Sequence, residues 1–309
     1  MHQGHPYMQY ALYQAQQPAM KPYPTVAPVS PETRSMLTLL ENLFKPELRE
    51  KAILDLARHR ESFPLLGPAL WYGVGTMAIL LQEIISVYPL LSIPQLLAKG
   101  TTSRVGSVLT LLQTVAFHDS TRRVFLEAQI CLFLYPFLRG SNESAEGLRL
   151  TSLGVIGALV KTDDKDVMRY LLGTEIFPLC LRIMETGTEF SKTLATFIVQ
   201  KLLLSELGLQ YVCQTPDRFT AVATVLRSMV NSKDCSARLL RHIIRCYLRL
   251  SENPRACDAL SRCLPEEMRN DTYKQALESN PNMKKWLLQL LVNIGDEGAK
   301  RIVEGNVSA

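Results

Sequence analysis

The fold of this chain is decided by a stretch that reads DSTRRVFLEAQICLFLYPFL at residues 119–138 and GLRLTSLGVIGALV at residues 147–160. Its apolar residues recur three and four positions apart, which is the period of a helix buried along one face. The stretch therefore predicts a short helix, a turn, a second helix and a longer third helix. It contains no alternating β-branched pattern, so we expect no strand there.

The same design recurs along the chain. Its paired short helices are DKDVMRYLLGTEIFPLCLRIM (164–184) and SELGLQYVCQTPDRFTAVATVL (205–226), and its long helices are SRVGSVLTLLQTVAF (103–117), FSKTLATFIVQKLLL (190–204) and SARLLRHIIRCYLRL (236–250). Units that begin at residues 119, 164 and 205 are 45 and 41 residues apart, in or near the band of ~40 to 47 residues typical of armadillo and HEAT repeats. Three helices per unit favour armadillo repeats.

A single unit of this kind cannot bury its own apolar face, so neighbouring units must stack into one continuous core with an extended concave groove. We predict an all-α, armadillo-type α-solenoid of about six three-helix repeats over residues 32–295. Residues 1–31 are rich in Gln, Tyr and Pro without an aliphatic period, and we expect a disordered tail there. Residues 296–309 are expected to form a flexible C-terminal tail.

Composition narrows the class of protein. Among 309 residues, 34 Lys and Arg against 29 Asp and Glu leave a net charge of +5, too small an excess to indicate nucleic-acid binding by itself. The seven cysteines are never spaced as CxxC, which is typical of reduced core thiols in a cytosolic or nuclear protein. No window reaches the ~18 apolar residues of a membrane span, and no basic-then-apolar leader is present, so we expect neither membrane insertion nor secretion.

Signatures of catalysis are missing from the sequence. It contains no GxxxxGK[ST], HExxH or GxSxG motif and no Cys/His cluster at metal-ligand spacing, and each of these patterns is what the corresponding chemistry requires. We therefore predict no catalytic residue, no metal site and no cofactor, and expect that the protein is not an enzyme.

Basic residues recur at matching positions of the long helices. Each long helix has a cation near its start, at successive separations of 45, 43 and 46 residues: Arg104, Arg149, Lys192 and Arg238. The helix dipole favours anions at that end, so local helix energetics do not explain these cations. They predict a basic ladder along one wall of the groove. The last long helix adds Arg241, Arg245 and Arg249, which share one helical face with Arg238.

Two interpretations of these cations are open at this point. They form a solvated face, or ion pairs with Asp and Glu of neighbouring repeats. Alternatively, they line an anion-binding groove for nucleic-acid phosphates or acidic peptide flanks. The second interpretation predicts weak, salt-sensitive and sequence-tolerant binding of nucleic acid.

Several long fragments are distinctive enough to identify a family. They are ESFPLLGPALW (61–71), FLYPFL (133–138), LRLTSLGVIGALVKTD (148–163) and SARLLRHIIRCYLRLSENPRA (236–256). Together they resemble the Rcd-type (required for cell differentiation), Caf-forty-like family, the armadillo-repeat subunit of the Ccr/Not messenger-RNA deadenylase complex. The resemblance runs from about Glu32 to Trp286 and implies a non-catalytic adaptor that docks on the large Not scaffold subunit.

The resemblance also implies partners. It implies binding of tryptophan-containing segments of GW-type silencing proteins and of helical motifs of RNA-bound repressors, and so a role in mRNA decay, deadenylation and translational repression. Homodimers and oligonucleotide binding are further features of the family. We expect a cytoplasmic location that includes P bodies, with a second, nuclear role in transcription regulation.

Binding residues are carried over from the family position by position. Arg218, after the YVCQT segment, and Arg255, in the NPRA turn, take the places of the family's tryptophan pocket. The alternative is that they are only turn and C-terminal charges. Pro216 replaces an aromatic residue of that pocket, and Tyr72 replaces another family side chain. Leu194 falls in the concave peptide site, although buried repeat core is an equal interpretation of the sequence.

Two other classes of protein also use grooved helical repeats. A nucleic-acid-binding protein would use the basic groove as its main surface, and its affinity would fall steeply with salt. A peptide carrier of the nuclear-import kind needs arrays of groove Trp and Asn residues. The chain has only Trp71 and Trp286, so the sequence does not support a carrier.

Overall fold

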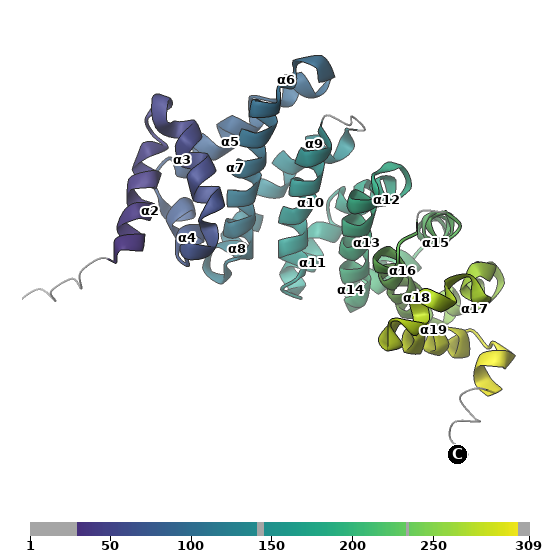
Figure 1. Ribbon diagram of the computed structural model, residues 1–309. Coiled ribbons are helices and arrows are strands. Elements are labelled where there is room, and N and C mark those ends of the chain that lie inside the picture. The colour runs from purple at the N-terminus through teal and green to yellow at the C-terminus, as the bar shows by residue number, and fades with distance from the viewer. Residues whose placement is uncertain (1–29, 141–144, 233–234, 302–309) are drawn as a thin grey trace, which may run out of the picture.

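The computed structural model describes residues 30–140, 145–232 and 235–301, and within these ranges it contains helices and turns but no strand. The helices stack side by side into a curved array that runs from α2 to α19 (Figure 1). This arrangement confirms the predicted armadillo-type solenoid.

Six units make up the array. The first three comprise α2 (Pro31–Asn42) and α3 (Pro46–Arg58); α4 (Leu66–Tyr72), α5 (Thr76–Ile85), α6 (Tyr88–Leu91) and α7 (Lys99–Phe117); and α8 (Asp119–Glu127), η3 (Ile130–Leu134), α9 (Tyr135–Arg139) and α10 (Glu146–Val160). The last three comprise α11 (Lys165–Leu172), α12 (Ile176–Thr186) and α13 (Glu189–Leu204); α14 (Glu206–Cys213), α15 (Pro216–Val230) and α16 (Ala237–Leu250); and α17 (Pro254–Cys263), α18 (Lys274–Glu278) and α19 (Pro281–Asn293).

The long last helix of each unit packs on the long helix of the next. Contacts run from α3 to α7 and on through α10, α13 and α16 to α19. Leu109, Leu153, Ile198 and Ile243 of this row are fully buried, and burying one such side chain stabilises a fold by ~1.5 to 3 kcal/mol. The inner helices of the row, α7, α10, α13 and α16, each have such a neighbour on both sides.

Helix starts are set by polar caps and prolines. Side chains that accept a hydrogen bond from a backbone N–H of the first turn cap seven of the later helices: Asp164, Thr188, Ser205, Thr215, Ser236, Asn253 and Asn280. Such a cap stabilises a helix by ~0.5 to 2 kcal/mol. Pro216, Pro254 and Pro281 occupy first-turn positions, where the missing N–H costs nothing.

The ends of the folded part differ from the predicted boundaries. Ser30 caps α2, which begins at Pro31, so the end of the predicted N-terminal tail belongs to the fold; residues 1–29 of that prediction lie outside the described residues. The flexible C-terminal tail was wrong for residues 297–301, which are helical. Ala299 is buried there, and Asp296 pairs with Arg269 at 3.1 Å. Residues 302–309 lie outside the described ranges.

The cysteines are all free thiols, and Cys131, Cys180 and Cys246 are fully buried, as predicted for core thiols, whereas the other four are half-buried. In the described residues, no individual helix has both the length and the apolar composition of a membrane span. The pair Leu66–Tyr72 and Thr76–Leu91 passes that composition test only when taken together, across an 88° bend.

Candidate peptide-binding surface

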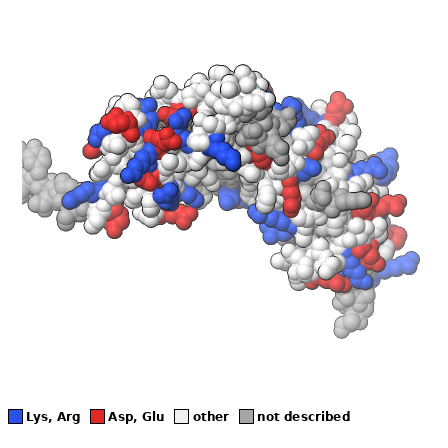
Figure 2. Space-filling view, turned by 45° about the horizontal axis from the view of Figure 1, so that its top comes forward, with Lys and Arg blue, Asp and Glu red and all other residues white. Residues whose placement is uncertain are grey.

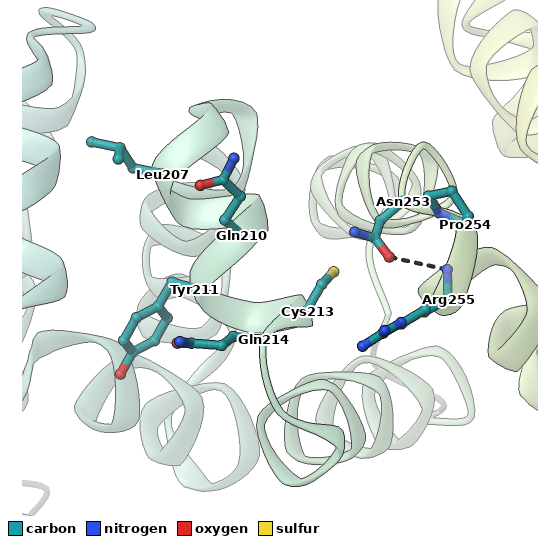
Figure 3. Close-up of a pocket in the computed structure, with 8 residues that line it drawn as sticks. All are labelled: Leu207, Gln210, Tyr211, Cys213, Gln214, Asn253, Pro254 and Arg255. Atoms are coloured by element: carbon teal, nitrogen blue, oxygen red, sulfur yellow. Dashed lines mark hydrogen bonds between the residues drawn. The ribbon is translucent and has the colours of Figure 1, made fainter.

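A cavity of about 690 Å³ opens between α14 and the start of α17. Its lining residues are Leu207, Gln210, Tyr211, Cys213, Gln214, Asn253, Pro254 and Arg255. We call it the Tyr211–Arg255 cavity. Figure 3 shows Arg255 extending from α17 toward the α14 side and the Cys213 thiol pointing into the gap from the opposite side.

Local sequence explains how α14 forms one wall. Ser205 caps the helix, and the first turn then packs so closely on the end of α13 that a Cβ at Gly208 would lie 1.9 Å from the Leu202 carbonyl oxygen. Only glycine fits at this position. The lining residues of α14 that follow three or four positions apart, Leu207, Gln210, Tyr211 and Gln214, then share one face of the helix.

Arg255 is held at the opposite wall by the N-terminal cap of α17. The Asn253 side chain accepts hydrogen bonds from the backbone N–H groups of Arg255 at 3.1 Å and Ala256 at 3.2 Å. The Arg255 guanidinium has no carboxylate partner among the described residues. A guanidinium beside amide side chains can hold an indole, since the guanidinium face attracts the ring by ~0.5 to 2 kcal/mol. Figure 3 shows that the Tyr211 ring points away from Arg255.

Arg218 supports the cavity from behind and does not line it. Its guanidinium lies 4.0 Å from the centre of the Tyr211 ring. Its Nη1 donates to the Tyr211 carbonyl oxygen at 3.2 Å and to Gln214 Oε1 at 3.1 Å. The structure thus makes Arg218 a positioning residue for two of the lining side chains.

The other two residues expected in the pocket lie elsewhere. Pro216 is exposed at the first turn of α15 and is not among the lining residues. Tyr72 is at the end of α4, three units away along the array (Figure 1), where its hydroxyl donates to the Ser120 carbonyl oxygen at 3.2 Å. Placing Tyr72 in the same pocket was wrong, because sequence position alone does not show which surfaces meet. Tyr211 lines the cavity although it was not predicted to do so. It is the first residue of the YVCQT segment that precedes Arg218, and this was the signal in the sequence.

A second cavity of about 770 Å³ adjoins the first and shares Tyr211 with it. Its other lining residues are Gln129, Leu132, Tyr135, Pro136, Arg139, Tyr170, Gly173, Thr174, Glu175 and Pro178. The Tyr135 hydroxyl donates to Thr174 Oγ1 at 2.6 Å, and burial raises the pKa of Tyr135 and of Tyr170. Both phenols therefore remain hydrogen-bond donors. The Tyr211 ring, packed edge-on to Phe177 at 5.6 Å, separates two sites that can each take an aromatic side chain.

Three of the predicted groove cations, Arg104, Arg149 and Arg249, form ion pairs with carboxylates of the solenoid. Arg104 pairs with Glu83 at 3.0 Å and Glu50 at 3.8 Å, and Arg249 pairs with Glu206 at 2.9 Å and with Glu252. Arg104–Glu50 is an ion pair with a neighbouring repeat, the alternative that the sequence left open, whereas Arg104–Glu83 and Arg249–Glu206 lie within one unit.

Arg149 was predicted to belong to an exposed basic ladder, but it is buried. Only 5% of this residue is exposed; it pairs with Glu146 and donates to the Gly140 carbonyl oxygen. Glu146 in turn accepts hydrogen bonds from Thr188, at 2.6 Å, and Ser191. The cation at this helix start therefore neutralises a carboxylate that ties α10 to α13, and the exposed ladder of four cations does not form.

The remaining cations lie beside an apolar strip. Lys192, Arg238, Arg241 and Arg245 have no carboxylate partner in the described part of the chain. Leu194 is half-buried and packs on the core next to Phe197 and Gly157, and Phe190, one turn earlier, is 68% exposed. The face of α13 and α16 thus combines apolar and cationic side chains.

His242 lies beneath this cationic face. Its Nδ1 is 2.6 Å from Gln200 Oε1, and Phe197 packs edge-on to its ring at 5.7 Å. Burial, followed by Arg241, Arg238 and Arg245, lowers the pKa of His242 to about 4. The imidazole is consequently neutral near pH 7. No group of three or more His, Cys, Asp or Glu residues suited to a metal ion occurs in the described residues.

Known proteins similar to this chain agree with the resemblance noted above. Residues 39–294 match the family model described as the Rcd1-like cell differentiation family. Cell differentiation protein rcd1 of Schizosaccharomyces pombe is 56% identical over 252 residues, covering 80% of this chain and 89% of that protein. Protein CAF40 of Saccharomyces cerevisiae is 50% identical over 254 residues, covering 81% of this chain and 68% of that protein.

Solved structures support the fold alone. A designed armadillo repeat protein superposes with a TM-score of 0.55 at 12% identity, covering 84% of this chain and all of that one. Another, solved in complex with the peptide (KR)4, gives a TM-score of 0.51 at 12% identity over 84% of this chain and 99% of that one. With a family model that matches most of the chain and two relatives at 50% identity or above, this chain belongs to the Rcd1-like cell differentiation family.

Proposed function

We propose that the protein is a non-catalytic adaptor subunit of the Ccr/Not mRNA deadenylase complex that captures peptide segments of RNA-bound regulators. The observation that carries this proposal is the Tyr211–Arg255 cavity, with a second aromatic-lined cavity directly beside it. Two adjoining sites for aromatic side chains suit a flexible segment with repeated tryptophans, such as those of GW-type silencing proteins. Capture of that kind would bring deadenylation and translational repression to chosen messages in the cytoplasm.

Isothermal titration calorimetry with a synthetic tryptophan-containing peptide tests the cavity. Replacing Arg255 by Glu removes the cation that would stack on the indole, and we expect affinity to fall about tenfold, which corresponds to ~1.4 kcal/mol. The matched control is Arg182→Glu, since Arg182 is exposed on α12 and lines none of the cavities. Equal affinity of the Arg255→Glu and Arg182→Glu proteins would remove the cavity from the proposal.

Docking on the large Not scaffold subunit needs a separate, apolar surface, and the second unit offers one. Ala78 and Ile85 share one face of α5, Val74 lies in the turn before it, and Ile93 and Leu96 follow α6; all five are exposed. Val74 alone is 92% exposed. The segment of residues 86–98 carries no charged side chain, and Figure 2 shows a broad uncharged area over α6 at its top. Exposed apolar side chains grouped on an uncharged surface mark protein interfaces.

Co-purification tests this α5–α6 face, defined by the five residues above. The double variant Ile85→Glu/Leu96→Glu places two charges in the apolar surface, so recovery of the tagged protein should lose the scaffold subunit and the deadenylase nucleases. Lys51→Glu, an exposed change on α3, serves as the control. Undiminished recovery of the scaffold by the double variant would exclude this face as the dock.

A second candidate function is nucleic-acid binding by the cationic part of the long-helix face. Arg238, Arg241 and Arg245 of α16 lack carboxylate partners, and Lys284 and Lys285 are exposed on the adjoining α19. A single-stranded oligonucleotide that neutralises Z phosphates should lose affinity with salt at a slope of about −0.7Z. Gel shifts at several salt concentrations check this, and affinity unchanged in Arg238→Glu/Arg241→Glu would contradict it.

A further inference from the structure

A third cavity, of about 730 Å³, lies on the other side of Leu207. It is lined by Asp163, Lys165, Met168, Arg169, Lys201, Leu204, Ser205, Glu206, Leu207 and Arg245, and we call it the Lys165–Arg245 cavity. Leu207, the second residue of α14, lines both this cavity and the Tyr211–Arg255 cavity. An extended segment that crosses the start of α14 would therefore reach both.

The carboxylates of this cavity are already neutralised. Asp163 accepts from Lys201 Nζ at 2.8 and 3.1 Å, and Glu206 pairs with Arg249 at 2.9 Å. Arg169 pairs with Asp166 at 2.6 Å. After these pairs are counted, Lys165 and Arg245 are the lining cations that have no carboxylate partner among the described residues. The cavity thus keeps an excess of positive charge.

The two cations are placed differently. The Arg245 guanidinium lies 4.6 Å from the centre of the Trp286 ring, so its position is fixed from one side by α19. Lys165 is exposed at the first position of α11, the end of a helix where the dipole disfavours a cation. Its neighbour Asp164 is occupied in capping the helix. Helix energetics therefore do not explain Lys165, whereas an anionic ligand would.

The floor and rim of the cavity fit a side chain with a short apolar stem. Met168 is buried, and Leu204 is half-buried, so the floor is apolar. Asp163 at the rim has φ of 54°, a left-handed conformation that is uncommon for a residue other than glycine and that persists where the surrounding structure enforces it. The Asp163 carboxylate is bonded to Lys201 and forms no ion pair with Lys165.

We propose that the Lys165–Arg245 cavity is a subsite for acidic residues of the same peptide whose aromatic side chain enters the Tyr211–Arg255 cavity. The inference rests on the proposed function and narrows it: the preferred partner segment has a tryptophan with Asp or Glu a few residues away. The carboxylate lies between Lys165 and Arg245, and its aliphatic stem lies over Met168 and Leu204.

Fluorescence anisotropy with three sets of labelled synthetic peptides tests the subsite. Each peptide has one tryptophan in a Gly/Ser background, flanked on either the N- or the C-terminal side by Asp-Glu, by Asn-Gln or by no further residues. Two partly exposed ion pairs add little each, so on the flank that reaches the Lys165–Arg245 cavity the acidic pair should tighten binding about three- to tenfold over Asn-Gln. The gain should shrink as salt rises.

Single-residue variants show which side chains cause the gain in affinity from the acidic flank. Lys165→Glu should abolish the preference for the acidic flank, and Arg245→Gln should reduce it. Lys99→Glu changes the net charge by the same amount as Lys165→Glu at an exposed site in the first turn of α7, and should keep the preference. Because Arg245 packs on Trp286, the melting temperature of the Arg245→Gln protein is measured as well. If Arg245→Gln proves destabilised, the test rests on Lys165→Glu, whose site is exposed.

The outcomes separate the two proposals. Equal affinity for the acidic and neutral flanks on both sides, with tryptophan binding still lost in Arg255→Glu, overturns the subsite and leaves the proposed function standing. A preference that Lys99→Glu removes as effectively as Lys165→Glu shows a general charge effect and also overturns it. Displacement of only the acid-flanked peptides by a single-stranded oligonucleotide would assign the cavity to phosphates. Failure of every peptide to bind would reject the peptide-capture function itself.

Discussion

Arginines that share a sequence pattern have unlike roles once the chain is folded. Arg149 is buried with Glu146, and removing its charge leaves a buried carboxylate without compensation. Arg149→Met should lower the free energy of unfolding by ~3 to 5 kcal/mol, whereas Arg238→Met, at an exposed position, should change it by no more than ~0.5 kcal/mol. Urea denaturation of both proteins checks this, and similar stabilities would contradict it.

His242 should make stability depend on mild acid. Its pKa in the fold is about 4, against an ordinary value of 6.5, because burial and then Arg241, Arg238 and Arg245 disfavour the charged ring. Its contribution is fully present above pH 6.5 and is lost as the pH falls from 6.5 toward 4, since only the unfolded chain binds the proton in that window. The free energy of unfolding should fall by up to ~1.4 kcal/mol per pH unit there.

Chemical denaturation at pH 7, 6 and 5 measures that slope. His242→Gln keeps a hydrogen-bonding group beside Gln200 but cannot take up the proton, so its stability should depend less on pH over the same range. If the two proteins show the same slope, His242 is not the group responsible.

At the scale of single helices, α14 couples the fold to the cavities, because its first turn packs directly on the end of α13. Gly208→Ala would place a Cβ 1.9 Å from the Leu202 carbonyl oxygen, and overpacking of this kind costs ~1 to 3 kcal/mol or more. We expect a lower melting temperature and weaker tryptophan-peptide binding together. Gly147→Ala is the control, since nothing lies within 4 Å of a Cβ there.

Two apolar residues of α13, Phe190 and Leu194, differ in burial, and this difference separates a peptide-binding role from a role in the repeat core. Phe190 is 68% exposed, whereas Leu194 packs partly into the core. Phe190→Glu should leave thermal stability nearly unchanged and weaken capture of helical repressor peptides, while Leu194→Glu should also destabilise the fold because it brings a charge against buried neighbours. Peptide capture unaffected by Phe190→Glu, measured by calorimetry, would mean that this strip binds no such peptide.

Across the whole molecule, the proposed scaffold dock and the peptide cavities belong to different units. The α5–α6 face lies in the second unit and the Tyr211–Arg255 cavity between the fifth and sixth (Figure 1). Sites this distant usually act additively. Ile85→Glu/Leu96→Glu should therefore abolish scaffold association without changing tryptophan-peptide affinity, and Arg255→Glu should do the reverse. A change in both properties from either variant would show that the two surfaces are coupled.

The repeat class, the helix periodicity and the family can all be predicted from the amino-acid sequence alone. Each of these depends on residues near one another in the chain: the spacing of Leu and Ile along a helix, caps such as Thr215 and Asn253, and fragments such as those at residues 148–163. Through the resemblance the sequence also predicts binding roles for Arg255, which lines the cavity, and for Arg218, which does not. Local spacing and caps act within a single helix, which is why they are readable without the fold.

Which charges are unpaired and which side chains meet depends on the packing of the units against one another. Glu146 and Arg149 are near in sequence, but their burial depends on α13, whose Thr188 and Ser191 complete the network. The Tyr211–Arg255 cavity joins residues more than forty positions apart, and Tyr72 was misplaced for the same reason. Packing between units sets burial and neutralisation, and a pattern within one helix carries no information about the carboxylates that the adjoining helices bring.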